Sequence, residues 1–111
     1  MNQANNNLAQ VDVLAVMERS SNMAVSHARE FPASATLTRH ADECREALSA
    51  VAELVAACKE RDEAEGEYSV AAAMYGEESN CEEMRSVRRR SRKAVVRYAA
   101  AMRPFNGSDK A

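Results

Sequence analysis

A dense group of cationic side chains near the C-terminus offers the clearest chemistry in this sequence. Seven arginine and lysine residues lie within the thirteen positions from 85 to 97. The guanidinium group of arginine is planar and donates paired hydrogen bonds to phosphate or carboxylate oxygens. The sequence therefore predicts a surface for a phosphate, a nucleic acid, a nucleotide or an acidic partner. Its candidate residues are Arg85, Arg88, Arg89, Arg92 and Lys93.

A second set of candidate ligands lies in the first half of the chain. His40, Glu43 and Cys44 occupy positions i, i+3 and i+4, which share one face of a helix. A tetrahedral zinc site needs a fourth ligand, and the sequence places none nearby at a recognisable spacing. Packing and solvation explain these residues better, so we predict no metal site and no cofactor.

Catalytic motifs are not evident. A Cys-His catalytic pair must be held in a pocket together with an oxyanion hole, and this alanine-rich sequence with three glycines indicates no such cleft. The sequence also contains no glycine-rich phosphate loop and no Ser-His-Asp arrangement. We therefore predict a non-enzymatic protein.

The candidate residues must be positioned by helices, of which the longest spans residues 37–75 without a proline. Its apolar residues recur at alternating steps of four and three, a period of about 3.5 that is typical of coiled coils. We call these residues the apolar seam: Leu37, Ala41, Cys44, Leu48, Val51, Val55 and Cys58, continued by Tyr68 and Tyr75. The charged segment 59–67 interrupts the seam. Either the helix changes its covered face there or it kinks near Gly66, and we favour a continuous helix.

Turn and capping signals divide the rest of the chain. We predict helices at about 8–30, 35–75 and 80–103 within one helical domain, 7–105, and flexible ends at 1–6 and 106–111. The predicted helix starts are an Asn7 cap with Gln10 three residues further on, a cap at Ser34 or Thr36, and a capping box of Ser79 and Glu82. The predicted helix stops are Phe31-Pro32, a left-handed Gly76, and Pro104 with Gly107. The third helix adds seam residues Met84, Val87 and Tyr98. The first helix has a mixed apolar pattern that Glu18 and Ser21 interrupt.

Short connections make sequential helices antiparallel neighbours, so the first helix covers the first half of the long helix and the third covers its second half. Residues whose numbers sum to about 156 should then face each other across the second turn. This register places Tyr98 near Cys58, Val87 near Ser69 and the arginines opposite the acidic segment 59–67. An intramolecular ion-pair network therefore competes with phosphate binding for the cationic side chains, and we prefer the ion-pair interpretation.

Composition limits the possible partners and settings. A net charge of −2 argues against a general nucleic-acid coat. Twenty-two alanines and only five leucines predict a thin core, so packing of copies into a homo-oligomer would add buried surface. No segment has the roughly 18 consecutive apolar residues of a membrane span, and no signal peptide is evident. These two features predict a cytoplasmic setting. Three cysteines cannot all pair within the chain, and we predict that they are reduced, buried packing residues.

The sequence thus predicts an all-α protein, a three-helix antiparallel bundle or coiled-coil-like hairpin with a long central helix. Its predicted role is a self-associating interaction module that acts as an adaptor or inhibitor of another protein. Two alternatives stay open: nucleic-acid or nucleotide binding through the third helix, and a purely structural oligomer. Small size, a charge-rich helical hairpin and no catalytic motif also occur in accessory proteins of phages and mobile elements, although no diagnostic residue indicates a family.

Overall fold

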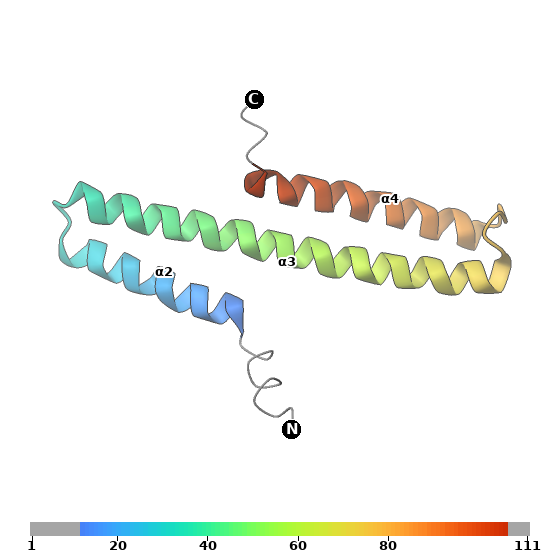
Figure 1. Ribbon diagram of the computed structural model, residues 1–111, viewed down its shortest axis with the longest axis horizontal. Helices are drawn as coiled ribbons and strands as arrows, with labels where there is room; N and C mark the ends of the chain where they lie inside the picture. Colours follow the sequence, from blue (N-terminus) through green and yellow to red (C-terminus); the bar gives the residue numbers. More distant parts are fainter. Residues whose placement is uncertain (1–11, 107–111) are drawn as a thin grey trace, which may run out of the picture. The chain divides into compact units, whose positions relative to one another are not determined.

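The computed structural model describes residues 12–106, and within this range the chain forms three α-helices and no strand (Figure 1). The elements are α2 (Val13–Glu30), α3 (Ala35–Tyr75), α4 (Glu82–Met102) and a 3-10 turn, η1 (Arg103–Phe105). The predicted all-α fold with a long central helix is confirmed. The chain divides into two compact units, of which the first ends at Val51 and the second begins at Ala52, both within α3. The single domain over 7–105 stays a prediction.

The N-terminal boundary of α2 differs from the predicted one. Asp12 has an extended backbone, and its Oδ1 accepts a hydrogen bond from the backbone N–H of Ala15 at 3.0 Å. This cap starts the helix at Val13, so the prediction of one helix running from about residue 8 is wrong at that end. The predicted cap residues Asn7 and Gln10 lie outside the described residues. The same is true of Leu8 and of the predicted flexible positions 1–6.

The connection between α2 and α3 follows the predicted signals. α2 ends at Glu30, and Phe31 caps it before Pro32, because a residue that precedes proline disfavours helical dihedrals. The Oγ of Ser34 accepts a hydrogen bond from the backbone N–H of Leu37 at 3.2 Å. Ser34 is therefore the cap of α3, which decides between the two candidates that the sequence offered.

In the first unit, α2 lies antiparallel to the first part of α3 (Figure 1). The buried side chains are small: Ser21 and Ala24 on α2 and Ala41 on α3. Seam residues that are half-buried flank this site: Leu37, Cys44, Leu48 and Val51. Ser21, which the sequence marked as an interruption of the apolar pattern, is thus part of the packed face. A small hydroxyl side chain fits there because the neighbouring buried positions are alanines.

α3 is one continuous helix of 41 residues that passes through Gly66, as we predicted. A Cβ added to Gly66 would meet no atom within 4 Å, so this glycine is not required by packing. The helix ends after Tyr75, where Gly76 adopts a φ of 93° and donates its N–H to the carbonyl of Ala72. This left-handed conformation suits glycine and confirms the predicted stop.

α4 begins at Glu82, and its N-cap is Cys81, whose side chain makes no capping hydrogen bond. The predicted capping box of Ser79 and Glu82 is therefore wrong. The Oγ of Ser79 instead accepts a hydrogen bond from the backbone N–H of Cys81, two residues ahead, and forms a local turn. At its other end α4 stops at Met102 and Pro104 lies in η1; the predicted stop at Gly107 lies outside the described residues.

In the second unit, α4 lies antiparallel to the second part of α3, and we call this pair the second hairpin (Figure 1). The guanidinium carbon of Arg61 lies 4.1 Å from the ring centroid of Tyr98. Near the turn, Ala71 packs with Met84 and Val87, and Tyr68, Ala72 and Cys81 contact this cluster. The register agrees with the predicted one to within three residues. The α3 residue that contacts Tyr98 is Arg61, whereas we predicted Cys58 at that place.

Small side chains fill the contact between α3 and α4. On α3 the buried residues Ala57, Ala64 and Ala71 recur every seven positions, and on α4 Val87, Ala94 and Ala101 do the same. The observed register puts these two rows level with each other. Small residues at heptad spacing let two helices approach closely. Met84 is the only large side chain that is fully buried among the described residues.

Two residues of the predicted seam are not covered. Val55 is 46% exposed and Tyr75 is 42% exposed, so the prediction that both are buried packing residues is wrong. The buried row in this half of α3 begins at Ala57, one residue before the predicted seam position, because α4 covers the face that carries the alanines. Cys58, Tyr68 and Tyr98 are half-buried, and Met84 and Val87 are buried, as predicted.

Candidate interaction surface on the second hairpin

Arg97 of α4 joins two carboxylates of α3. Its Nε and Nη2 donate to the two carboxylate oxygens of Glu53 at 3.0 and 3.2 Å, and its Nη1 donates to Glu60 at 2.6 Å. Hydrogen bonds and charge from Arg97 lower the pKa of Glu53, and the hydrogen bonds that Arg97 donates to Glu53 and Glu60 raise the pKa of Arg97. Arg97 is therefore paired with two carboxylates within the hairpin, and an external anion would have to compete with them.

Arg90 makes a second ion pair between the two helices. Its Nε lies 3.0 Å from an oxygen of Glu67. Both side chains are about half exposed, and an ion pair of this kind contributes about 0.2–1 kcal/mol to stability. The predicted pairing of the arginines with the acidic segment 59–67 is thus confirmed for Arg90 and Arg97, and Glu53 extends it beyond that segment.

Two of the candidate anion-binding arginines hold the connecting loop. Arg88 donates from Nη2 to the backbone carbonyls of Glu77 at 2.9 Å and Ser79 at 2.6 Å, and Arg85 donates to the carbonyl of Asn80. Carbonyl oxygens at a turn otherwise need water as a partner, so these contacts stabilise the loop. A phosphate at this place would have to compete with them.

The other three candidates are exposed on α4. Lys93 lines a small hollow of about 280 Å³ with Glu60, Glu63 and Glu67. Arg89 and Arg92 make no ion pair with any of the residues that the structure describes. The five predicted residues do not converge on one site, because they are divided between the loop, the hollow and the outer face of α4. Their binding of an anion stays a prediction.

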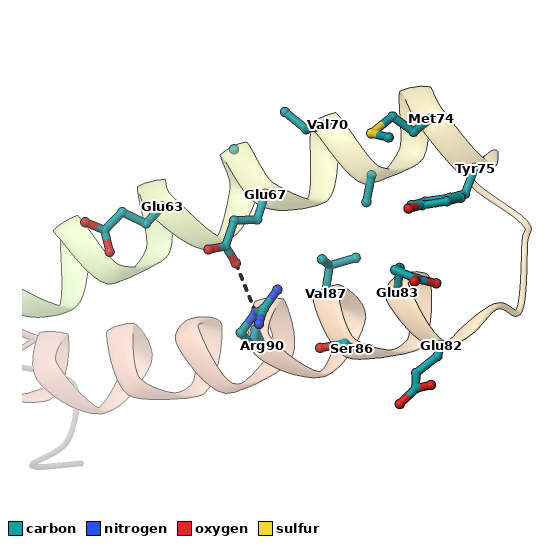
Figure 2. A pocket seen from close by; sticks show the side chains of 12 residues that line it. Glu63, Glu67, Val70, Met74, Tyr75, Glu82, Glu83, Ser86, Val87 and Arg90 are labelled. Carbon is teal, nitrogen blue, oxygen red and sulfur yellow. Dashed lines mark ion pairs between the residues drawn. The ribbon is translucent and has the colours of Figure 1, made fainter.

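A larger groove lies next to this hollow, between α3 and α4 near the turn, with a volume of about 910 Å³ (Figure 2). Val70 and Met74 project from the same edge of α3 and are 62% and 67% exposed. Val87 points from α4 towards α3, Glu83 lies along α4 on the side of Tyr75, and Arg90 reaches Glu67 at the end away from the turn. The full lining is Glu63, Gly66, Glu67, Val70, Ala71, Met74, Tyr75, Glu82, Glu83, Ser86, Val87 and Arg90.

The lining of the groove is mostly apolar and acidic. It consists of Gly66, four apolar side chains, Tyr75, four glutamates, Ser86 and Arg90. Exposed apolar side chains bordered by polar ones are typical of surfaces that bind another macromolecule.

We did not predict this groove from the sequence, although one signal was available. Val70 and Met74 are four residues apart, share a helix face and lie outside the apolar seam. Apolar residues that repeat at helical spacing on a second face indicate a second contact surface.

The three candidate ligands in the first unit, which we did not predict to bind a metal, are only partly brought together. The Nε2 of His40 lies 3.6 Å from the Sγ of Cys44, one helical turn away. Within residues 12–106, no group of three histidine, cysteine or acidic side chains is arranged to hold a metal ion.

Comparisons with known protein families, with curated proteins and with solved structures give no match to this chain. None of the helices in the described part of the chain combines the length and the apolar character that crossing a membrane requires.

Proposed function

We propose that this protein is a non-enzymatic interaction module that binds another protein through the groove of the second hairpin. The observation that carries the proposal is the adjacent exposure of Val70 and Met74 above the groove. Burying an exposed valine or methionine side chain gains about 1.5–3 kcal/mol each, which is enough to anchor a contact. Methionine also adapts its shape to a partner because its side chain is unbranched.

The module acts by occupying a surface of its partner, as an adaptor or an inhibitor does. Self-association through other exposed apolar side chains belongs to the same proposal, and the thin alanine core supports it, since contact between copies adds buried area. A cytoplasmic setting is supported by three unpaired cysteines, Cys44, Cys58 and Cys81, because thiols stay reduced in that compartment.

Nucleic-acid or nucleotide binding through α4 is the second candidate. The exposure of Arg89 and Arg92 favours it, since neither side chain makes an ion pair within residues 12–106. Against it, Arg90 and Arg97 are neutralised by carboxylates of α3. The other five cations of α4 are divided between the loop, the hollow and the outer face of the helix, whereas nucleic-acid-binding domains carry one continuous basic stripe.

Affinity capture with matched variants tests the proposal. We expect wild-type protein to retain a stoichiometric protein partner from a lysate of the source cells, Met74→Glu to lose it, and Val96→Glu to keep it. Val96 is a suitable control because it is 68% exposed and belongs to α4 outside the groove lining. A partner that all three forms retain equally, or co-purification of nucleic acid alone, would contradict the proposal.

A further inference from the structure

The α3 side of the groove is a continuous stripe with two chemical halves. Glu63, Glu67, Val70 and Met74 follow one another at steps of four, three and four along one face of α3. The stripe is about 17 Å long at the helical rise per residue, which matches about three turns of a second helix. Its apolar half lies next to the turn and its acidic half lies away from it.

The charge around the groove is predominantly negative. The lining contains four glutamates and a single cation, Arg90, which is already paired with Glu67. Glu63 and Glu83 make no ion pair among the residues described in the structure. These two carboxylates, one from each helix that borders the groove, are therefore open to cations brought by a ligand, and Glu63 also lines the neighbouring hollow with Lys93.

We propose that the groove binds a basic amphipathic helix of the partner protein. Apolar residues at i and i+4 of that helix pack on Val70 and Met74, and its lysine or arginine side chains lie next to Glu63 and Glu83. This is the helix-in-groove mode of recognition, in which apolar contacts give affinity and complementary charge gives specificity. The inference rests on the proposed function and adds the chemistry of the partner to it.

Two designed peptides of about 18 residues serve as probes in fluorescence anisotropy at about 0.15 M salt. Both carry leucine at i, i+3 and i+4 positions; one has lysine and the other glutamate at the flanking positions, with alanine elsewhere. We expect wild-type protein to bind the lysine peptide about tenfold more tightly than the glutamate peptide, and Glu63→Gln/Glu83→Gln to lose most of that preference.

Two further variants separate groove binding from general charge attraction. Met74→Glu and Val96→Glu add the same charge, so non-specific attraction would strengthen binding of the lysine peptide to both. Binding in the groove predicts instead that Met74→Glu weakens it about tenfold or more while Val96→Glu does not. Far-UV circular dichroism and thermal unfolding of each variant check that the fold is retained.

The remaining outcomes overturn the inference in distinguishable ways. Equal binding of both peptides, lost in Met74→Glu, would leave the groove as a protein-binding site and remove only the basic partner. Binding of neither peptide, with a captured partner still dependent on Met74, would assign the groove to a segment of other chemistry. A homodimer that Met74→Glu dissociates, with no peptide binding, would assign it to a second copy and overturn both proposals.

Discussion

The guanidinium group of Arg61 on α3 lies over the ring of Tyr98 on α4, with 4.1 Å between the guanidinium carbon and the ring centroid. The Nε of Arg61 is buried and has no hydrogen-bond partner among the described residues. The cation–π contact therefore offsets the cost of burying this donor. A charged residue thus occupies a packed position of the second hairpin, between the buried Ala57 and Ala64.

A double-mutant cycle measures the coupling between these two residues. We expect Arg61→Met and Tyr98→Leu to show a coupling energy of about 0.5–1 kcal/mol in urea unfolding. Arg61→Met alone should change stability by less than Tyr98→Leu, because it also removes an unpaired buried donor. Arg92→Met is the matched control and should not couple to Tyr98. A coupling near zero for Arg61 would mean that the contact contributes no stability.

The alanine rows predict strict limits on side-chain volume. Ala94 is 1% exposed and level with Ala64, so Ala94→Leu should force α3 and α4 apart and lower the free energy of unfolding by about 1–3 kcal/mol. The exposed Ala99 on the same helix is the control, and Ala99→Leu should stay within about 0.5 kcal/mol of wild type. Equal effects at the two positions, in chemical denaturation, would argue against close packing at Ala94.

The two described glycines should respond to alanine in opposite directions. Gly76 has a φ of 93°, so Gly76→Ala should cost about 1–2 kcal/mol because of its left-handed backbone. Gly66 is inside α3 with open space at its Cβ, so Gly66→Ala should stabilise by about 0.5–1 kcal/mol through helix propensity. Thermal unfolding of both variants checks this, and destabilisation by Gly66→Ala would show that α3 needs flexibility there.

The Arg97 contacts predict a stability that depends on pH. Arg97 lowers the pKa of Glu53 in the folded chain below its ordinary value of 4.5, so the carboxylate contributes stability above pH 4.5. That contribution should be lost as the pH falls from 4.5 through the lower folded pKa. Glu53→Gln should therefore reduce the melting temperature near pH 7 and have no effect at the acid end. Glu46→Gln, on the same helix and without an ion pair within the described range, is the control.

Binding to a generic DNA duplex tests the second candidate function. Because Arg90 and Arg97 are paired within the hairpin, we expect no binding to duplex DNA or to linear and cyclic nucleotides at about 50 mM salt. Binding that weakens steeply with salt and is lost in Arg89→Gln/Arg92→Gln would contradict this expectation and favour the nucleic-acid function.

The sequence by itself determined the helices, most of their ends and the antiparallel register to within three residues. These features follow from local signals: the steps of four and three along α3 and α4, the proline after Phe31 and the glycine after Tyr75. Such signals act through hydrogen bonds and dihedral preferences of residues that are close in the sequence. Two caps were predicted less well. At α2 the carboxylate of Asp12 accepts the capping hydrogen bond, and at α4 the Oγ of Ser79 bonds to the backbone N–H of Cys81 instead of capping the helix.

Only the tertiary structure decided which face of α3 is covered in its second half. Consecutive residues of a helix differ by about 100° in direction. The covered face is shifted by one position, so that Ala57 is buried in place of the predicted Cys58, and Val55 is left exposed. The same choice placed Arg61 against Tyr98 and left Val70 and Met74 uncovered beside the groove. The spacing of apolar residues indicates that a helix buries one of its faces. The position of the neighbouring helix determines which face is buried.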